Sequence, residues 1–373
     1  MKQGIFHLDL PISRLPGLEP VSDNTRPSAG QDMRFGLFGG TQATSEGFRN
    51  FVEFTTEAEA LGYHSSFVVE HHFTGWNQIS ATLQLLTWVA ARTRTLRIGT
   101  AVMVLPWHNP VLLAEQAATL DLLSEGRLDF GVGKGYRYTE FTGFCVPREE
   151  AEARFEEAFD VMLQAWSGKR FSHHGKYWQF ENVVVEPPPA QKPYPPIWMG
   201  GGSPASIRRV AELGCNLLLD QFATPETLGE RIALFKAEVE ARGRSFDPMT
   251  VAVARDVYVA KDEADTRAAL DRNARARQRI LEVSQFPGRK GGSHMLAYDH
   301  SVAIHEAVAI YGKPDDVMKK LEALQAVGVR YVLANIGGDS RESLRRLARD
   351  IVPAFSSSEE DRRNIAENRE VRA

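Results

Sequence analysis

The sequence has few cysteines, no long apolar run and almost no excess of charge. Among 373 residues there are 2 cysteines, Cys145 and Cys215, with no CxxC pattern, so we expect buried thiols, no disulfide framework and a reducing, cytoplasmic setting. No stretch reaches the roughly 18 apolar residues that span a bilayer, and the N-terminus lacks the basic start and apolar core of a signal peptide. The formal charge of −4 gives no strong field, so neither nucleic acid nor a membrane is expected as a partner.

The composition is that of a globular protein, with 43% hydrophobic and 25% charged residues. Residues 1–32 are rich in Pro, Gly and Ser and lack periodicity, which predicts an N-terminal extension. Residues 356–373 form a charged tail that is expected to fray. The domain is therefore predicted to span residues 33–355.

Within this domain, apolar or β-branched runs alternate with amphipathic helical stretches. Strands are predicted at 33–38, 66–69, 96–105, 127–133, 197–199, 216–220, 250–260 and 330–336. Helices are predicted at 45–61, 79–91, 110–123, 148–166, 204–213, 224–242, 263–283, 315–327 and 340–351, with a hairpin-like insertion at 169–185. Eight apolar strands with helical crossovers favour a (β/α)8 TIM barrel with insertions, and an open doubly wound sheet is the alternative.

The glycine-rich segment Gly200–Ser206 follows a predicted strand and opens a helix. Free backbone N–H groups, two hydroxyls and little side-chain bulk at a helix start favour an anion site, to which Lys134 of a neighbouring strand adds a cation. The pattern therefore indicates a phosphate site, although a plain glycine-rich turn has the same sequence. The segment 131–135 (GVGKG) does not fit a dinucleotide fingerprint, because its glycine spacing is wrong and no helix opens promptly after it.

Glu70-His71-His72 lies at the predicted end of the second strand. A strand-end histidine suits general acid/base work because its ordinary pKa lies near neutrality. A capping or core histidine pair is the competing interpretation. No metal is expected, because the other predicted strand ends carry no second histidine cluster and the sequence has no HExxH pattern. GxSxG is absent, so a serine hydrolase is not indicated.

Together these motifs resemble the bacterial luciferase-like, flavin-dependent monooxygenase family, and especially its alkanal monooxygenase α-chain branch. The resemblance runs from about Met33 to Phe355 and rests on the segments 70–74 (EHHFT), 98–106 (IGTAVMVLP), 109–116, 120–127 (LDLLSEGR) and 130–135 (FGVGKG). Several ordered motifs across a whole barrel are more specific than a lone glycine pattern.

The resemblance implies reduced FMN as the bound flavin, with His71 as the catalytic histidine and Glu70 beside it. It also implies a non-proline cis peptide between Ala101 and Val102 under the flavin ring. The cofactor-binding residues that it implies are Thr100, Ala101, Val102, Lys134, Gly135, Gly202, Ser203 and Ser206. The chain departs from luciferases in having Lys134 for an arginine, Gly133 for a cysteine and Gln221 for an aromatic residue, which counts against light emission.

The function implied is a two-component monooxygenase. Reduced FMN arrives from a separate flavin reductase, O2 adds at C4a to give a peroxyflavin, and one oxygen atom enters an apolar organic substrate such as an aldehyde. The alternatives are a dehydrogenase or reductase that uses the deazaflavin F420, and a non-catalytic flavin-binding subunit. The resemblance further implies a homodimer through the helices after strands two and three, and a lid near 289–292.

The substrate pocket is expected to be aromatic. Its candidate residues are Phe38, Trp76, Trp107, Tyr136, Tyr138 and Phe222. Aromatic side chains in such positions favour an apolar organic substrate, although packing alone also explains them.

Overall fold

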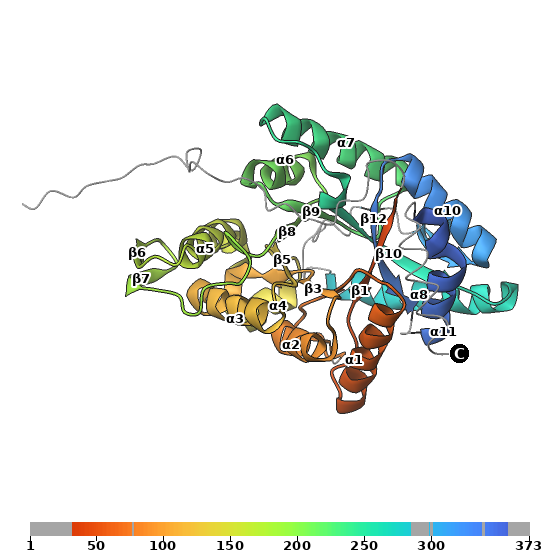
Figure 1. The fold of residues 1–373 in the computed structure, drawn as a ribbon, viewed down its shortest axis with the longest axis horizontal. Coiled ribbons are helices and arrows are strands. Elements are labelled where there is room, and N and C mark those ends of the chain that lie inside the picture. Colours follow the sequence, from red (N-terminus) through yellow and green to blue (C-terminus); the bar gives the residue numbers. More distant parts are fainter. Residues whose placement is uncertain (1–31, 77, 285–297, 299–300, 338–339, 357–373) are drawn as a thin grey trace, which may run out of the picture.

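A closed barrel of parallel strands forms the centre of the molecule (Figure 1). The computed structural model describes residues 32–76, 78–284, 298, 301–337 and 340–356. The barrel strands are β1 (Arg34–Gly39), β2 (Ser65–Val68), β3 (Arg97–Thr100), β5 (Leu128–Gly133), β8 (Ile197–Gly200), β9 (Asn216–Leu219), β10 (Val251–Val259) and β12 (Tyr331–Ile336). Each strand pairs with the next in this order, and β12 pairs with β1, so the ring closes. The predicted (β/α)8 barrel is confirmed and the open sheet is wrong.

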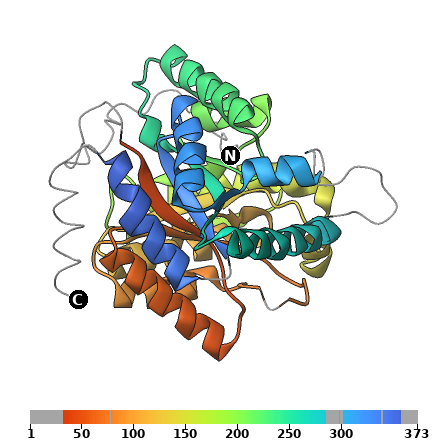
Figure 2. The same ribbon diagram turned by 90° about the vertical axis from the view of Figure 1, so that its right-hand side faces the viewer.

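The helices form an outer layer around the strands (Figure 2). They are α1 (Ser45–Ala60), α2 (Thr82–Arg92), α3 (Pro110–Leu123), α4 (Tyr138–Gly143), α5 (Ala151–Trp166), α6 (Pro204–Leu213), α7 (Pro225–Ala241), α8 (Glu263–Ser284), α9 (Val302–Val308), α10 (Pro314–Ala326) and α11 (Arg341–Arg346). The expected hairpin within 169–185 is present as the antiparallel pair β6 (Phe171–His174) and β7 (Gln179–Val183).

Local sequence explains where several helices begin. Asn109, Ser203 and Thr224 cap α3, α6 and α7 with their side chains, and a proline follows each cap at the first helical position. This order satisfies free N–H groups and places proline where its missing donor costs nothing. For α1 the cap is Thr44, whose side chain accepts from Gly47 N.

The interior of the barrel is filled by large side chains. Phe67 of β2 meets Trp198 of β8 edge to face, with ring centroids 5.7 Å apart, and Trp198 in turn meets Tyr331 of β12 at 5.9 Å. Leu218 and Leu333 belong to the same buried cluster and also line the cavity described below. The barrel is therefore a packed core, whose upper layer is the floor of a cavity.

The structure differs from the sequence prediction in a few places. The predicted strand 96–105 is interrupted after Thr100, where the Ala101–Val102 peptide is cis, and resumes as β4 (Met103–Val104) beside β5. The short elements α4, α9 and β11 (Ile310–Gly312) were not predicted, because three to seven residues carry too little periodicity. Of the cysteines, Cys215 is buried as expected, but Cys145 is exposed in the loop after α4.

Some predictions fall on other parts of the chain. Residues 1–31, the tail 357–373 and the predicted lid 289–292 lie outside the described residues. In the part that is described, no helix combines the length and the apolar composition needed to cross a bilayer.

Candidate active site

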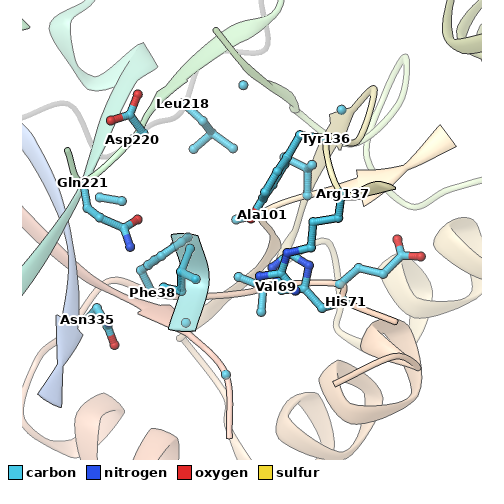
Figure 3. Close-up of a pocket in the computed structure, with 18 of the residues that line it drawn as sticks. Phe38, Val69, His71, Ala101, Tyr136, Arg137, Leu218, Asp220, Gln221 and Asn335 are labelled. Carbon is cyan, nitrogen blue, oxygen red and sulfur yellow. The ribbon is translucent and has the colours of Figure 1, made fainter. Parts of the chain in front are cut away.

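One large cavity opens at the carboxyl ends of the barrel strands, where β/α barrels carry their reactive groups. Its volume is about 1080 Å³, and residues in or just after every barrel strand line it, some of which are drawn in Figure 3. Small-ligand pockets commonly measure about 300–1,000 Å³, so there is room for a cofactor and a substrate together. The expected site residues all line this cavity except Thr100.

His71 follows β2 and is held by a buried carboxyl group. Its Nδ1 lies 3.0 Å from Oε1 of Glu140, which is 1% exposed. A carboxylate only accepts hydrogen bonds, so with Glu140 ionised the Nδ1–H donates and Nε2 carries the free lone pair. Burial lowers the pKa of His71, Arg137 lowers it further, and Glu140 opposes both. His71 is therefore a neutral imidazole at pH 7, held in orientation by Glu140, and it can accept a proton at Nε2.

Glu140 and Arg137 come from the segment just after β5. The same Glu140 oxygen accepts from the backbone N of His72 at 3.0 Å and lies 3.8 Å from a guanidinium nitrogen of Arg137. Arg137 also donates to Oε1 of Gln78 at 2.7 Å. Two strand ends are thereby tied together through buried polar groups, which fixes the position of the His71 ring.

Glu70 faces a different set of partners. Its Oε2 accepts from Val104 N at 2.9 Å, and its Oε1 accepts from the Trp107 indole at 3.0 Å and from the imidazoles of His72 and His108 at 2.7 and 2.8 Å. Burial alone raises the pKa of Glu70, but the bonds from the two histidines and Trp107 outweigh it and bring the pKa to about 2. Both carboxyl oxygens are thus engaged in holding β4 against β2, and a catalytic role for Glu70 stays a prediction.

The wall between β3 and β5 is a close backbone contact. A Cβ at Gly131 would lie 1.8 Å from Thr100 O, and one at Gly133 would lie 2.5 Å from Val102 Cγ2. Thr100 itself is fully buried and exchanges hydrogen bonds with the Gly131 backbone at 2.7 and 2.8 Å. Thr100 therefore supports this wall from behind, while Ala101 and Val102 face the cavity.

The start of α6 forms the opposite end of the cavity. Ser203 and Ser206 cap the helix reciprocally, and their hydroxyl oxygens lie 3.0 Å apart. Lys134 is paired with Glu152 of α5 in an exposed ion pair, which contributes little by itself and exchanges readily. The guanidinium of Arg231 lies close to Gly202, at about 3.5 Å from where a Cβ would stand. Hydroxyls, a helix start and two cations suit a phosphate group.

Aromatic side chains line part of the cavity. Phe38, Trp76, Tyr136 and Phe222 do so, whereas Trp107 and Tyr138 do not. The indole N–H of Trp107 instead donates a hydrogen bond to Glu70, and its ring stacks on Phe144 with centroids 5.1 Å apart. The lining thus combines apolar surface with polar groups at two ends.

Several cavity residues were not singled out from the sequence, namely Gln78, Arg137, Glu140, Asp220 and Arg231. Glu140 and Arg137 had one signal, since both directly follow the strand end at Gly133. Arg231 had none, because it lies in the middle of α7 and reaches Asp220 and Tyr298 only through the fold. In the described part of the chain, no three His, Cys, Asp or Glu residues are arranged to hold a metal ion.

The lining of this cavity has groups that suit a phosphorylated flavin. The hydroxyls at the start of α6, the close backbone contact at Gly131 and Gly133, and the oriented His71 all belong to this one site.

Known proteins resemble this chain over most of its length. A relative from Acinetobacter baylyi, the oxygenase component of a flavin-dependent trigonelline monooxygenase, is 28% identical over 365 residues, covering 89% of this chain and 98% of its own. An uncharacterized protein of Sinorhizobium fredii is 33% identical over 245 residues, covering 65% of this chain and 70% of its own.

Two solved structures share the fold. The oxygenating constituent of 3,6-diketocamphane monooxygenase from Pseudomonas putida, in complex with FMN, has a TM-score of 0.72 at 18% identity, over 87% of this chain and 100% of that one. The coenzyme F420-dependent tetrahydromethanopterin reductase of Methanopyrus kandleri has a TM-score of 0.66 at 22% identity, with the same coverage. The sequence profile of the luciferase-like monooxygenases matches residues 33–331, and this chain belongs to that family.

Proposed function

We propose that this protein is the oxygenase component of a two-component monooxygenase, which uses reduced FMN and O2 to insert one oxygen atom into an apolar organic substrate. The observation that carries the proposal is the pairing of an oriented His71 with the phosphate cradle at α6 inside one cavity. The description of the Acinetobacter baylyi relative as a flavin-dependent oxygenase component supports it.

The residues of this chain have distinct roles in the proposal. Ser203, Ser206 and Lys134 would hold the phosphate, and Ala101 and Val102 would contact the flavin ring. His71 accepts and returns a proton at Nε2, held in place by Glu140. When bound, reduced FMN would supply the electrons and, with O2, the activated oxygen. The cavity walls keep water away from that chemistry.

The test has a binding arm and a turnover arm. Titration of FMN with the protein should quench flavin fluorescence, and Ser203→Ala with Ser206→Ala should weaken that binding. Oxygen uptake with FMN, a flavin reductase and a panel of aldehydes, sulfonates and terpenoid ketones should then rise above the uncoupled rate for one substrate class. Absence of flavin binding in either oxidation state would overturn the proposal.

Hydride transfer with the deazaflavin F420 is the second candidate, because the Methanopyrus kandleri neighbour shares the fold. Such an enzyme works without O2. Substrate turnover in an anaerobic vessel with reduced F420, and none with reduced FMN in air, would decide for this candidate. A non-catalytic flavin-binding subunit would bind FMN and show neither activity.

The flavin reductase is proposed as a separate protein. The two cysteines are consistent with the reducing cytoplasm, where reduced flavin is produced. Adding a reductase at catalytic amounts should therefore support turnover, and chemically reduced FMN should replace it.

We also propose a homodimer through α2 and α3, which pack against each other (Figure 1). Leu112 and Leu123 of α3 are 52% and 60% exposed, and Trp88 of α2 is 43% exposed. Leu112 and Leu123 are eleven residues apart, which is about three helical turns, so they share one face. Light scattering should give twice the mass of one chain, and Leu123→Lys should give monomers, whereas the exposed control Glu240→Lys on α7 should not.

A further inference from the structure

Arg137 is a buried cation whose hydrogen bonds are incomplete. Its side chain is 2% exposed, and its Nε has no hydrogen-bond partner in the described structure. One terminal nitrogen donates to the neutral amide of Gln78 at 2.7 Å, and the Tyr136 side chain also hydrogen-bonds Arg137. The nearest carboxyl oxygen, on Glu140, lies 3.8 Å away and is already taken by His71 and the His72 backbone. A guanidinium buried without a hydrogen-bonded anion is costly, so it needs an explanation.

A second arginine of the same cavity also has a hydrogen-bond donor without a partner. Arg148 lines the cavity, and its buried Nε also lacks a partner in the described part of the chain. Its guanidinium lies over the Phe141 ring at 5.1 Å. Arg277 has unpartnered nitrogens as well, but it does not line the cavity and packs on Phe222 instead. Arg137 and Arg148 therefore share two properties: both line the cavity, and both have a buried Nε without a partner among the described residues.

The position of Arg137 separates it from the phosphate cradle. Lys134 and Arg137 both follow β5, but Gly135 between them has a φ of 76° and turns the chain. Lys134 reaches Glu152 of α5, whereas Arg137 reaches Gln78 and the His71–Glu140 pair beyond β2. Since β2 and β8 lie on opposite sides of β5 in the barrel order, the two cations serve different ends of the cavity. Figure 3 shows Arg137 beside His71 and away from Asp220.

Apolar surface adjoins this cation. The Tyr136 ring meets the His71 ring edge to face, with centroids 6.1 Å apart, and the Arg137 guanidinium carbon lies 5.5 Å from the Tyr136 centroid. Trp76 lines the same region. A ligand placed here meets a flat aromatic surface, a proton acceptor and an anion-binding fork within one small volume.

We infer that the substrate is an organic carboxylate, whose acid group binds Arg137 while its apolar body lies against Tyr136 beside His71. This inference rests on the proposed function and narrows its apolar substrate to one with an acidic end. The planar fork of arginine matches the two oxygens of a carboxylate, and a bound carboxylate would give this buried guanidinium the hydrogen-bonded anion that it lacks. Arg148 adds a second cation to the same wall.

The experiment compares acids with their amides on the same skeleton. Benzoate with benzamide, and cyclohexanecarboxylate with its amide, are titrated into the protein with oxidised FMN bound, and the visible flavin absorbance is followed. The acids should bind about ten- to a hundred-fold more tightly than the amides, the range expected for charge-assisted hydrogen bonds. In Arg137→Met the ratio of the amide and acid dissociation constants should fall to about one. In Arg137→Lys this ratio should lie between the native and methionine values, since lysine keeps the charge but lacks the planar fork.

The matched control is Lys134→Met, which removes the cation at the other end of the cavity. It should weaken FMN binding and leave the ratio of acid to amide unchanged. Equal binding of acid and amide by the native protein would overturn the inference. An Arg137→Met variant that keeps the native preference for acids, or that loses FMN affinity and keeps this preference, would overturn it as well. If the methionine variant does not fold, an unchanged ratio in Arg137→Lys has the same meaning.

Failure of the proposed function is distinguishable from failure of this inference. If FMN does not bind, the acids and amides are titrated into the protein alone by calorimetry. If the protein alone then prefers acids to amides, and Arg137→Met removes this preference, the inference stands although the flavin proposal has failed. If FMN does bind but acids and amides bind equally well, only the inference fails.

Discussion

The two ends of the cavity are built by opposite means. Around His71 the polar groups are buried, with the Glu140 and Arg137 side chains 1% and 2% exposed, and each is fixed by neighbours. At the start of α6, Ser203 is exposed, Ser206 is half-buried and the Lys134 side chain is 43% exposed. Buried, pre-oriented groups suit a proton transfer, because nothing has to reorganise when the charge moves. Exposed groups suit a phosphate group that binds from solvent, because water replaces it at little cost.

The largest effect is expected from His71→Asn. If the buried end carries the chemistry, the variant should bind FMN as the native protein does and lose about 10²- to 10⁴-fold in kcat for coupled oxygenation, the usual contribution of a general acid or base. His174→Ala changes a histidine whose side chain is 64% exposed on the hairpin, and it should leave kcat unchanged. Equal turnover of native protein and His71→Asn would favour the binding-only subunit.

Glu70→Gln tests whether the buried end also stabilises the fold. Because the pKa of Glu70 is about 2 in the folded protein and about 4.3 in an unfolded chain, the ionised carboxyl contributes about 3 kcal/mol to the free energy of unfolding. This contribution is complete above pH of about 4.5 and is lost as the pH falls toward 2. Urea unfolding should show the variant less stable at pH 7, with the difference shrinking in acid.

The control for this prediction is Glu181→Gln, whose side chain is 76% exposed. It should leave the unfolding midpoint unchanged at every pH. A stability difference between native protein and Glu70→Gln that is constant from pH 7 to pH 3 would contradict the link to ionisation.

Glu140→Gln tests, through the pH dependence of kcat, whether the buried end of the cavity sets the pKa of His71. Burial and Arg137 lower the pKa of His71, while Glu140, and more weakly Glu70, raise it. Removing the Glu140 charge should lower this pKa further, so the acid limb of kcat moves to lower pH, and kcat at its plateau falls by about ten-fold because the ring is held less firmly. A limb that moves to higher pH would show that another group titrates.

The smallest effect is expected at the exposed end. Ser203→Ala with Ser206→Ala should raise the dissociation constant of FMN by about ten-fold, as loss of one or two hydrogen bonds implies, and leave kcat at saturating FMN unchanged. The cap lost from α6 should also cost about 1 kcal/mol. Thr44→Ala removes the comparable cap of α1, which lies outside the cavity. This control should lose a similar free energy of unfolding and leave the dissociation constant of FMN unchanged.

The strands and most helices could be predicted because their signals are local. Alternating apolar runs, N-cap residues and strand-end glycines lie within a few residues of one another, and the strand-end rule therefore located His71, Lys134 and Ser203 correctly in one cavity. The break after Thr100 could not be predicted from periodicity, because residues 96–105 form one continuous apolar run. The family resemblance pointed to it instead, through the cis peptide.

The partners of His71 needed the folded chain. Glu140 lies 69 residues from His71, and Arg137 lies 59 residues from Gln78, so no local pattern joins them. Thr100 shows the reverse case, since the family resemblance implied a contact with the cofactor and the side chain instead turns into the wall, where it donates to Gly131 O. Which side of a wall a residue faces depends on its neighbours in the barrel and not on its own sequence.

The close approach of Gly133 to Val102 limits how this protein can be redesigned. The resemblance to luciferases places a cysteine where Gly133 stands, and the Cβ of a side chain introduced here alone would lie 2.5 Å from Cγ2 of Val102. An engineer who seeks a light-emitting derivative would have to trim residue 102 in the same step. The two positions are best varied as a pair in any directed-evolution library.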